Sequence, residues 1–325
     1  MMRQWVAVGT ESGAVWQVRD SAPPAPAAGE LVVRVHAVSV NPVDTKLFAA
    51  LRPGQEKVLG FDAAGVVEAV GEGVTDFAPG DEVFYAGDVT RDGSFATHQR
   101  VDARLVARKP ESLSFAEAAA LPLVSLTAAE SLFEHLALPF PADGRLLVIN
   151  GAGGVGSMAI QLGRLAGAEV MATASREESA AWCRALGADE VIGHDAVAGI
   201  EADWILNAAH NLNDTLEAMA QAVRPFGRVC ALASAKGPVD INLFKDKSVG
   251  FEWTFMFTRA KHGVAPERQG AWLRRIARWV DGGQLRGIAR TDWGELSPET
   301  LARAFEEVRS GRMIGKGVLT LPQEP

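Results

Sequence analysis

The chain has 325 residues, of which 48% are hydrophobic and 22% are charged, and its formal net charge is −8. These values are typical of a globular protein of about two domains, and they exclude disordered, collagen-like and coiled-coil proteins. The acidic balance disfavours nucleic acid and anionic membrane surfaces as partners.

Cysteine content and the N-terminal segment predict the compartment. Cys183 and Cys230 are the only cysteines, which excludes a disulfide framework and a four-cysteine zinc site. Residues 1–9 do not resemble a signal peptide, and no run of about 18 apolar residues occurs. We therefore expect a cytoplasmic protein with reduced cysteines and no membrane span.

Short β-rich segments separated by glycine and proline turns occupy the first third of the chain. A proline-rich loop at 21–26 precedes a predicted strand at 31–38, and further strands are predicted at 64–71 and 82–85. This pattern predicts a small β-barrel-like domain.

The pattern changes near Ser114, which forms a predicted capping box with Glu117 at the start of a helix. Strands and helices then alternate along the chain. The alternation predicts an α/β protein with a doubly wound parallel sheet. The strands are predicted at 145–149, 169–173, 190–192, 204–208 and 228–233, with helices after the first two strands.

Two further helices and a strand are predicted at the C-terminal end, at 267–281, 298–308 and 317–321. Helix 267–281 carries an apolar stripe that includes Trp272 and a basic face that includes Arg275. A solvated basic face is favoured there over a membrane or nucleic-acid surface.

The strongest motif for function is the glycine-rich segment after the strand at 145–149. Gly151 permits a tight turn, Gly153 permits close approach of a pyrophosphate, and Gly156 permits close packing of the following helix. The helix N-terminus adds amide donors and a partial positive charge. A dinucleotide site is therefore predicted over a plain glycine-rich turn, with these contacts: Asn150, Gly151, Gly153, Gly154, Val155 and Gly156.

The end of the next strand predicts which cofactor binds. NAD sites usually have an acidic residue there, whereas this sequence continues with Ser175 and Arg176. A guanidinium suits the 2′-phosphate of NADPH, so NADPH is preferred over NADH. The alternative is that Arg176 is a solvated residue at a helix start.

The whole chain resembles the medium-chain dehydrogenase/reductase superfamily, and within it the quinone oxidoreductase branch, including zinc-type alcohol dehydrogenase-like proteins. The resemblance implies a GroES-like catalytic domain at 1–121, completed by 263–325, and a Rossmann NADP-binding domain at 122–262. The segments that carry it are 39–46, 59–67, 80–88, 118–123, 151–156 and 253–259.

The resemblance also makes one absence informative. Zinc alcohol dehydrogenases have a Cys where this chain has Pro42 or Val43, and His-Glu where it has Phe61 and Asp62. Phe61 cannot bind metal, and one carboxylate does not make a catalytic zinc site. No metal site is therefore expected.

Without zinc, the resemblance implies hydride transfer to a small-molecule quinone or α,β-unsaturated carbonyl, whose anionic product is delocalised. The catalytic candidates are Asn41, Lys46 and Tyr85. Their alternatives are a turn residue before proline for Asn41, a solvated side chain for Lys46, and a strand-end hydroxyl in water for Tyr85. Asp44 and Asp62 are expected to be structural partners of nearby donors rather than bases.

Further cofactor contacts are expected from the resemblance and from strand ends. Thr127 matches a threonine beside the nicotinamide, with an ordinary helix-start hydroxyl as the alternative, and Lys316 is expected to reach the cofactor phosphates. A buried strand is the alternative for the segment 256–258. The remaining predicted contacts are His194, Asn207, Met256, Phe257 and Thr258.

Two other functions stay open: an enoyl-thioester or alkenal reductase, and a weakly catalytic NADPH-binding redox sensor. Relatives pair the edges of their nucleotide-binding sheets, so a homodimer is expected through an aromatic-rich edge strand at 248–257.

Overall fold

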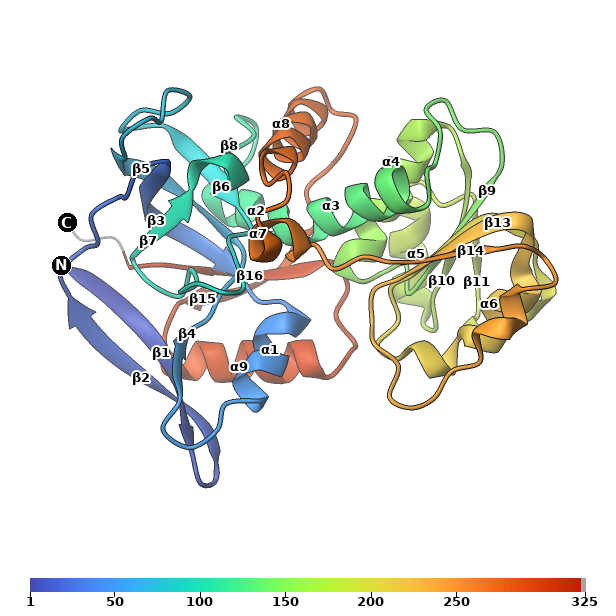
Figure 1. Ribbon diagram of the computed structural model, residues 1–325, viewed down its shortest axis with the longest axis horizontal. Coiled ribbons are helices and arrows are strands. Elements are labelled where there is room, and N and C mark those ends of the chain that lie inside the picture. The colour runs from blue at the N-terminus through green and yellow to red at the C-terminus, as the bar shows by residue number, and fades with distance from the viewer. Residues whose placement is uncertain (323–325) are drawn as a thin grey trace. The chain divides into compact units, whose positions relative to one another are not determined.

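The structure is a computed structural model that describes residues 1–322. The chain divides into two compact units, one formed by Met1–Leu123 with Phe257–Pro325 and the other by Val124–Met256 (Figure 1). The domain boundaries predicted from the sequence lie after residues 121 and 262. No helix in the described part of the chain has the length and apolar character that a membrane span requires.

The first unit contains two sheets. A three-stranded antiparallel sheet has the order β2-β1-β4, formed by β1 (Met2–Thr10), β2 (Gly13–Ser21) and β4 (Glu56–Val58). The larger sheet has the order β15-β16-β3-β5-β6-β8, and β7 also pairs with β3. Its strands are β3 (Glu30–Ser39), β5 (Ala63–Val70), β6 (Glu82–Tyr85), β7 (His98–Asp102), β8 (Ala107–Arg108), β15 (Ala289–Glu295) and β16 (Lys316–Thr320).

The C-terminal strand completes this larger sheet, because β16 pairs antiparallel with β3. Lys316 and Asn41, far apart in sequence, are thereby brought together. The helices of this unit are α1 (Pro42–Ala49), η1 (Ala103–Leu105), α2 (Phe115–Ala119), α7 (Thr258–His262), α8 (Glu267–Asp281) and α9 (Pro298–Arg309).

The second unit is built on a six-stranded, all-parallel sheet of order β11-β10-β9-β12-β13-β14. Numbered within the unit, this is the order 3-2-1-4-5-6 of a doubly wound dinucleotide-binding sheet. The strands are β9 (Arg145–Ile149), β10 (Glu169–Thr173), β11 (Glu190–Ile192), β12 (Ala202–Asn207), β13 (Val223–Ala231) and β14 (Gly250–Trp253).

Crossover connections that contain helices join these parallel strands, since parallel strands cannot be joined by a tight hairpin turn. With the β-rich first unit, the parallel sheet confirms the predicted α/β fold with a GroES-like and a Rossmann-type domain. The elements are α3 (Pro122–Ala129), which crosses the boundary, η2 (Glu130–His135), α4 (Gly154–Ala166), α5 (Glu177–Ala185), η3 (His194–Gly199), η4 (Leu212–Asp214), α6 (Leu216–Ala222) and η5 (Ile241–Phe244).

Two sequence predictions of local structure need correction or addition. The strand predicted at 248–257 is confined to β14, and the following segment forms a loop and turn, because the partner strand β13 ends at Ala231. The hairpin β1–β2 was not predicted, since most residues of β2 are exposed and give little apolar alternation.

Candidate functional site

The glycine-rich turn joins β9 to α4 in the second unit. Gly153 is the N-cap of α4, and Gly154 is its first residue. A Cβ atom on Gly156 would clash with the carbonyl oxygen of Asn150 and would lie 2.7 Å from the Gly151 backbone. The helix can therefore begin this close to the turn only with glycine at 156.

Gly151 and Gly153 differ in what surrounds them. A Cβ on Gly151 would lie 2.8 Å from the Ala172 side chain, so Gly151 lets the turn pass over β10. A Cβ on Gly153 would find its nearest atom, in the Asn150 side chain, at 3.4 Å. Gly153 is thus not required by the protein's own packing, which is consistent with space kept for a ligand.

Asn150 holds the turn to both neighbouring strands. It has a positive φ of 63°, its backbone N–H donates to the Thr173 hydroxyl at 2.9 Å, and its side chain donates to the carbonyl of Ala208 at 3.2 Å. Because β9 and β12 are neighbours where the strand order reverses, this turn lies at the switch point of the sheet, where ligands bind in open α/β sheets.

Asn207 ends β12 at that same switch point. It is buried, its amide donates to Thr215 at 2.7 Å, and its carbonyl oxygen accepts from the backbone of Ala209 at 3.0 Å. Its side chain therefore orders the loop after the strand, and cofactor contact by Asn207 stays a proposal.

The end of β10 carries no carboxylate. Ser175 and Arg176 are exposed there, and Arg176 is the N-cap of α5, with its backbone N–H donating to Ser179 at 3.2 Å. The nearest acids in the chain, Glu177 and Glu178, lie in the first turn of α5. His194 lies at the start of η3 and is exposed to solvent overall. The part of its imidazole that is buried lowers the pKa of the ring.

Three polar side chains form a buried cluster in the first unit, which we call the charge cluster: Asn41, Asp62 and Lys316. Their exposed fractions are 1%, 0% and 5%. The Lys316 ammonium donates to the Asn41 side-chain oxygen at 2.6 Å and to Asp62 at 3.3 Å. The Asn41 amide in turn donates to the same Asp62 oxygen at 2.7 Å.

The remaining bonding capacity of the charge cluster is also used. Asp62 accepts from the backbone of Leu123 at 2.8 Å, and Lys316 donates to the carbonyl of Val40 at 2.9 Å. Burial raises the pKa of Asp62 and lowers that of Lys316, while each charge counters the shift of the other.

Asp44 lies beside this cluster and caps the start of α1. It accepts from the backbone of Asn41 at 2.8 Å and of Gly60 at 2.9 Å. Burial raises the pKa of Asp44 to about 7, although these bonds and Lys316 act in the opposite direction. The expectation that Asp44 and Asp62 are partners of nearby donors agrees with these bonds.

The contacts of Lys316 lie within the first unit, and its predicted contact with the cofactor phosphates stays a proposal. Its three N–H donors face Val40, Asn41 and Asp62, and the ammonium is buried. The sequence motif around Lys316 marked this lysine as a candidate functional residue. It gave no information on the partners of Lys316, because they lie more than 250 positions earlier in the chain.

Tyr85 departs from the alternative given for it, whereas the exposure of Lys46 agrees with its alternative of a solvated side chain. The Tyr85 hydroxyl does not lie in water: the side chain is 1% exposed, its hydroxyl has no hydrogen-bond partner, and burial raises its pKa. Lys46, on α1, is exposed.

The last predicted contacts are near the boundaries of the two units. Thr127 is buried on α3, and its carbonyl accepts from Ser131 at 2.7 Å. Met256 and Phe257 are buried in a turn and Thr258 begins α7, so the alternative of a buried strand is wrong. Phe257 packs edge-on against Phe61 at 5.2 Å between ring centroids.

One buried polar network was missed in the sequence. The hydroxyls of Ser131 and Thr254 are hydrogen-bonded at 2.9 Å, and the Cys230 sulfur lies 3.0 Å from the Thr254 hydroxyl. No spacing signal links these residues, since η2, β13 and the loop after β14 meet only in the folded unit.

The donor set of the described residues does not fit a bound metal. Residues 1–322 contain no group of three or more His, Cys, Asp or Glu side chains placed to hold one. Asp62, the carboxylate in the segment that resembles a zinc site, is held by Asn41, Lys316 and Leu123 instead. The glycine-rich turn, by contrast, fits a dinucleotide.

Comparisons with known proteins agree with this description. The model of the alcohol dehydrogenase GroES-like domain matches residues 27–111, and that of zinc-binding dehydrogenases matches residues 154–262. A zinc-type alcohol dehydrogenase-like protein of Staphylococcus aureus is 37% identical over 322 residues, which are 96% of this chain and 96% of that protein.

Two further proteins carry more specific names. The 2-methylene-furan-3-one reductase of Solanum lycopersicum is 30% identical over 303 residues, 89% of this chain and 71% of that protein. The crystal structure of CurK enoyl reductase has a TM-score of 0.81 at 26% identity and covers 98% of this chain and 100% of that one. On these matches, the chain belongs to the medium-chain dehydrogenase/reductase superfamily, a family of oxidoreductases that bind a nicotinamide cofactor.

Proposed function

We propose that the protein is an NADPH-dependent, metal-independent reductase that transfers hydride to a quinone or an α,β-unsaturated carbonyl. The observation that carries the proposal is the set of partners of Asp62. A lysine ammonium, an amide and a backbone N–H use its lone pairs in a buried site, in the segment where related zinc enzymes have a ligand.

The cofactor would bind through the second unit. The amides of the turn at 151–156 and the N-terminus of α4 bind the pyrophosphate, and Gly153 leaves room for it. Ser175 and Arg176 bind the 2′-phosphate, because a guanidinium pairs with phosphate in a bidentate manner and no carboxylate at the end of β10 repels it. Thr127, His194, Asn207 and the backbone of 256–258 remain proposed contacts.

NADPH, when bound, supplies the hydride. Asn41 is proposed to contact the nicotinamide or the acceptor, and Asp62 and Lys316 fix the orientation of its amide. Lys46 is free to donate to a ribose or acceptor oxygen. The Tyr85 hydroxyl, which is buried and has no partner, is proposed to donate to a developing oxyanion.

The names of the relatives favour an activated alkene as the acceptor. One is a 2-methylene-furan-3-one reductase and another an enoyl reductase. The second name also favours the second candidate function, reduction of an enoyl thioester. A third candidate, a weakly catalytic NADPH-binding redox sensor, predicts binding without turnover.

A single assay tests these candidates. NADPH oxidation is followed with benzoquinone, an alkyl vinyl ketone and an enoyl thioester as acceptors, each with EDTA. We expect turnover with the ketone or the quinone that EDTA does not change, and a lower Michaelis constant for NADPH than for NADH. Loss of turnover with EDTA, or equal constants for the two cofactors, would contradict the proposal.

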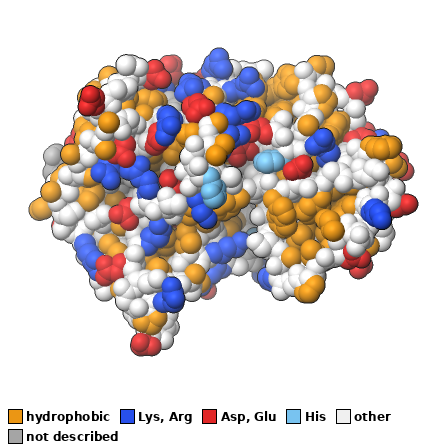
Figure 2. Space-filling view, viewed as in Figure 1, with side chains coloured by type: hydrophobic (Ala, Val, Ile, Leu, Met, Phe, Trp, Pro, Cys, Tyr) orange, Lys and Arg blue, Asp and Glu red, His pale blue; other side chains and the backbone are white. Residues whose placement is uncertain are grey.

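We further propose a homodimer that forms at the edge of the parallel sheet, in a cytoplasmic protein. β14 is an edge strand, and Trp253 and Phe255 are 46% and 49% exposed beside it. Figure 2 shows a hydrophobic patch in the part of this unit where Figure 1 labels β14. Light scattering at micromolar concentration should give twice the mass of the chain, and a monomer would contradict pairing.

A further inference from the structure

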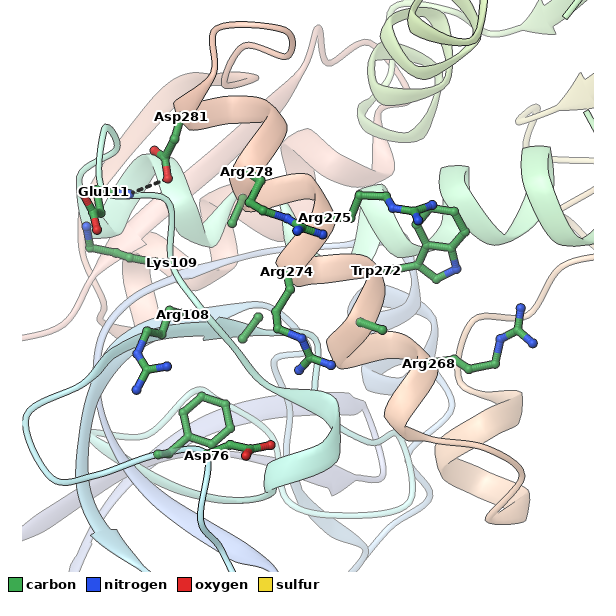
Figure 3. A pocket seen from close by; sticks show the side chains of 14 residues that line it. Asp76, Arg108, Lys109, Glu111, Arg268, Trp272, Arg274, Arg275, Arg278 and Asp281 are labelled. Atoms are coloured by element: carbon green, nitrogen blue, oxygen red, sulfur yellow. Dashed lines mark hydrogen bonds between the residues drawn. The ribbon is translucent and has the colours of Figure 1, made fainter. Parts of the chain in front are cut away.

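A basic pocket of about 890 Å³ lies in the first unit, between α8 and the end of β8 (Figure 3). Its volume is in the range of small-molecule sites. Figure 2 shows Lys and Arg side chains gathered where α8 lies in Figure 1. The pocket is lined by six cationic side chains, Arg108, Lys109, Arg268, Arg274, Arg275 and Arg278, and by three carboxylates, Asp76, Glu111 and Asp281.

Some of these charges are already satisfied. Arg108 pairs with Asp81 at 2.7 Å, and Lys109 pairs with Glu82 at 2.9 Å. Asp281 accepts from the backbone of Glu111 and of Ser112, a contact that Figure 3 shows in part. Its carboxylate is therefore used to hold the end of α8 in place.

The arginines in the middle of α8 have no such partners. Neither Arg274 nor Arg278 contacts a carboxylate in the described chain, and both are exposed. They are four residues apart on one helix, where like charges destabilise the helix. Arg275 lies over the Trp272 ring at 5.1 Å and over the Trp279 ring at 5.7 Å, which orients its guanidinium without neutralising it.

The frame that carries these arginines is fixed. α8 buries Leu273, Ile276 and Val280, and contacts η1 and β8. A Cβ on Gly270 would lie 2.5 Å from the carbonyl oxygen of Arg104, so the backbone of α8 approaches η1 closely there. An anion that enters the pocket would therefore meet guanidinium groups carried on a fixed helix backbone, of which Arg275 is also oriented by the two tryptophan rings.

We propose that this arginine pocket binds a small molecule with two or more phosphoryl groups, at a site separate from that of NADPH. Guanidinium groups match phosphoryl oxygens in geometry and charge. Because three carboxylates share the pocket, a monovalent anion gains little, and a polyanion gains most from several guanidinium groups at once.

Isothermal titration with inorganic tripolyphosphate, at physiological ionic strength and with or without saturating NADPH, tests the proposal. We expect one saturable site with a Kd on the order of 0.1 mM or tighter. Its affinity should be unchanged by NADPH and at least about tenfold weaker in an Arg274→Gln/Arg278→Gln variant. A matched Lys245→Gln/Arg309→Gln variant removes two exposed positive charges elsewhere and should bind within about twofold of the wild type.

Four results would overturn the proposal. They are the absence of saturation, equal affinity for sulfate at matched ionic strength, wild-type affinity in the Arg274→Gln/Arg278→Gln variant, and competition by NADPH. Competition would show that the probe binds at the glycine-rich turn. Because Arg274 and Arg278 are exposed like charges, the thermal midpoint of their variant should be no lower than that of the wild type, which separates lost binding from lost folding. NADPH affinity, measured in the same samples, reports on the cofactor site independently.

Discussion

The glycine-rich turn of the second unit and the charge cluster of the first both depend on close approach, but they achieve it by different means. In the turn, close approach is possible because Gly151 and Gly156 have no Cβ atom. Ala172 and the turn's own backbone would leave no room for one. In the charge cluster, close approach is stabilised by hydrogen bonds between the buried side chains of Asn41, Asp62 and Lys316. The first device is local in sequence, and the second joins residues from three separate segments.

The largest expected effect comes from breaking the charge cluster. Lys316→Met leaves Asp62 buried without its counter-ion, so the free energy of unfolding should fall by about 3–5 kcal/mol. Urea denaturation measures the loss. Adding Asp62→Asn removes the unpaired charge, so the double variant should lose less than the two single variants together. Additive losses would mean that the two side chains are not coupled.

Asp44 extends this test to pH. Its pKa of about 7 in the fold lies above the value in the unfolded chain, so the folded protein binds more protons between those values. Asp44 therefore contributes roughly 2–4 kcal/mol to the free energy of unfolding below about pH 4. This contribution is lost as the pH rises through about 7. Denaturation at several pH values should show a flatter profile in Asp44→Asn than in the wild type. Parallel profiles would contradict the raised pKa.

The glycine-rich turn should respond through sterics. Gly156→Ala places a Cβ against the Asn150 carbonyl and the Gly151 backbone, which should cost about 1–3 kcal/mol of stability and weaken NADPH binding. Gly153→Ala has room in the protein, so it should keep its stability and lose only cofactor affinity. Fluorescence titration with NADPH, beside urea denaturation, separates the two. Gly199→Ala, whose Cβ meets no atom within 4 Å, is the control.

The smallest expected change in stability is that of Tyr85→Phe. The Tyr85 hydroxyl is buried without a partner, so its removal breaks no hydrogen bond and should shift stability by no more than about 1 kcal/mol. If Tyr85 donates to the developing oxyanion, kcat should fall by roughly tenfold or more while the fold is unchanged. An unchanged kcat would remove Tyr85 from the proposed mechanism.

Local pattern was enough for much of the fold. The predicted strands at 145–149, 169–173 and 190–192 and the helix at 267–281 coincide with β9, β10, β11 and α8, and Ser114 and Glu117 form the predicted capping box. Periodicity and turn chemistry act within a few residues, so a single sequence carries them. The mostly exposed strand β2 lacked that signal.

The glycine-rich turn, the strand-end arginine and the family could all be read from the sequence alone, because each is encoded in contiguous residues. The partners of Lys316, the burial of the Tyr85 hydroxyl and the arginine pocket became visible in the folded chain. Hydrogen bonds and pockets are made by side chains that are distant in sequence, and their direction depends on how strands such as β3 and β16 pair. A charged residue therefore shows in the sequence which chemistry it can perform, whereas the fold decides which atoms it faces.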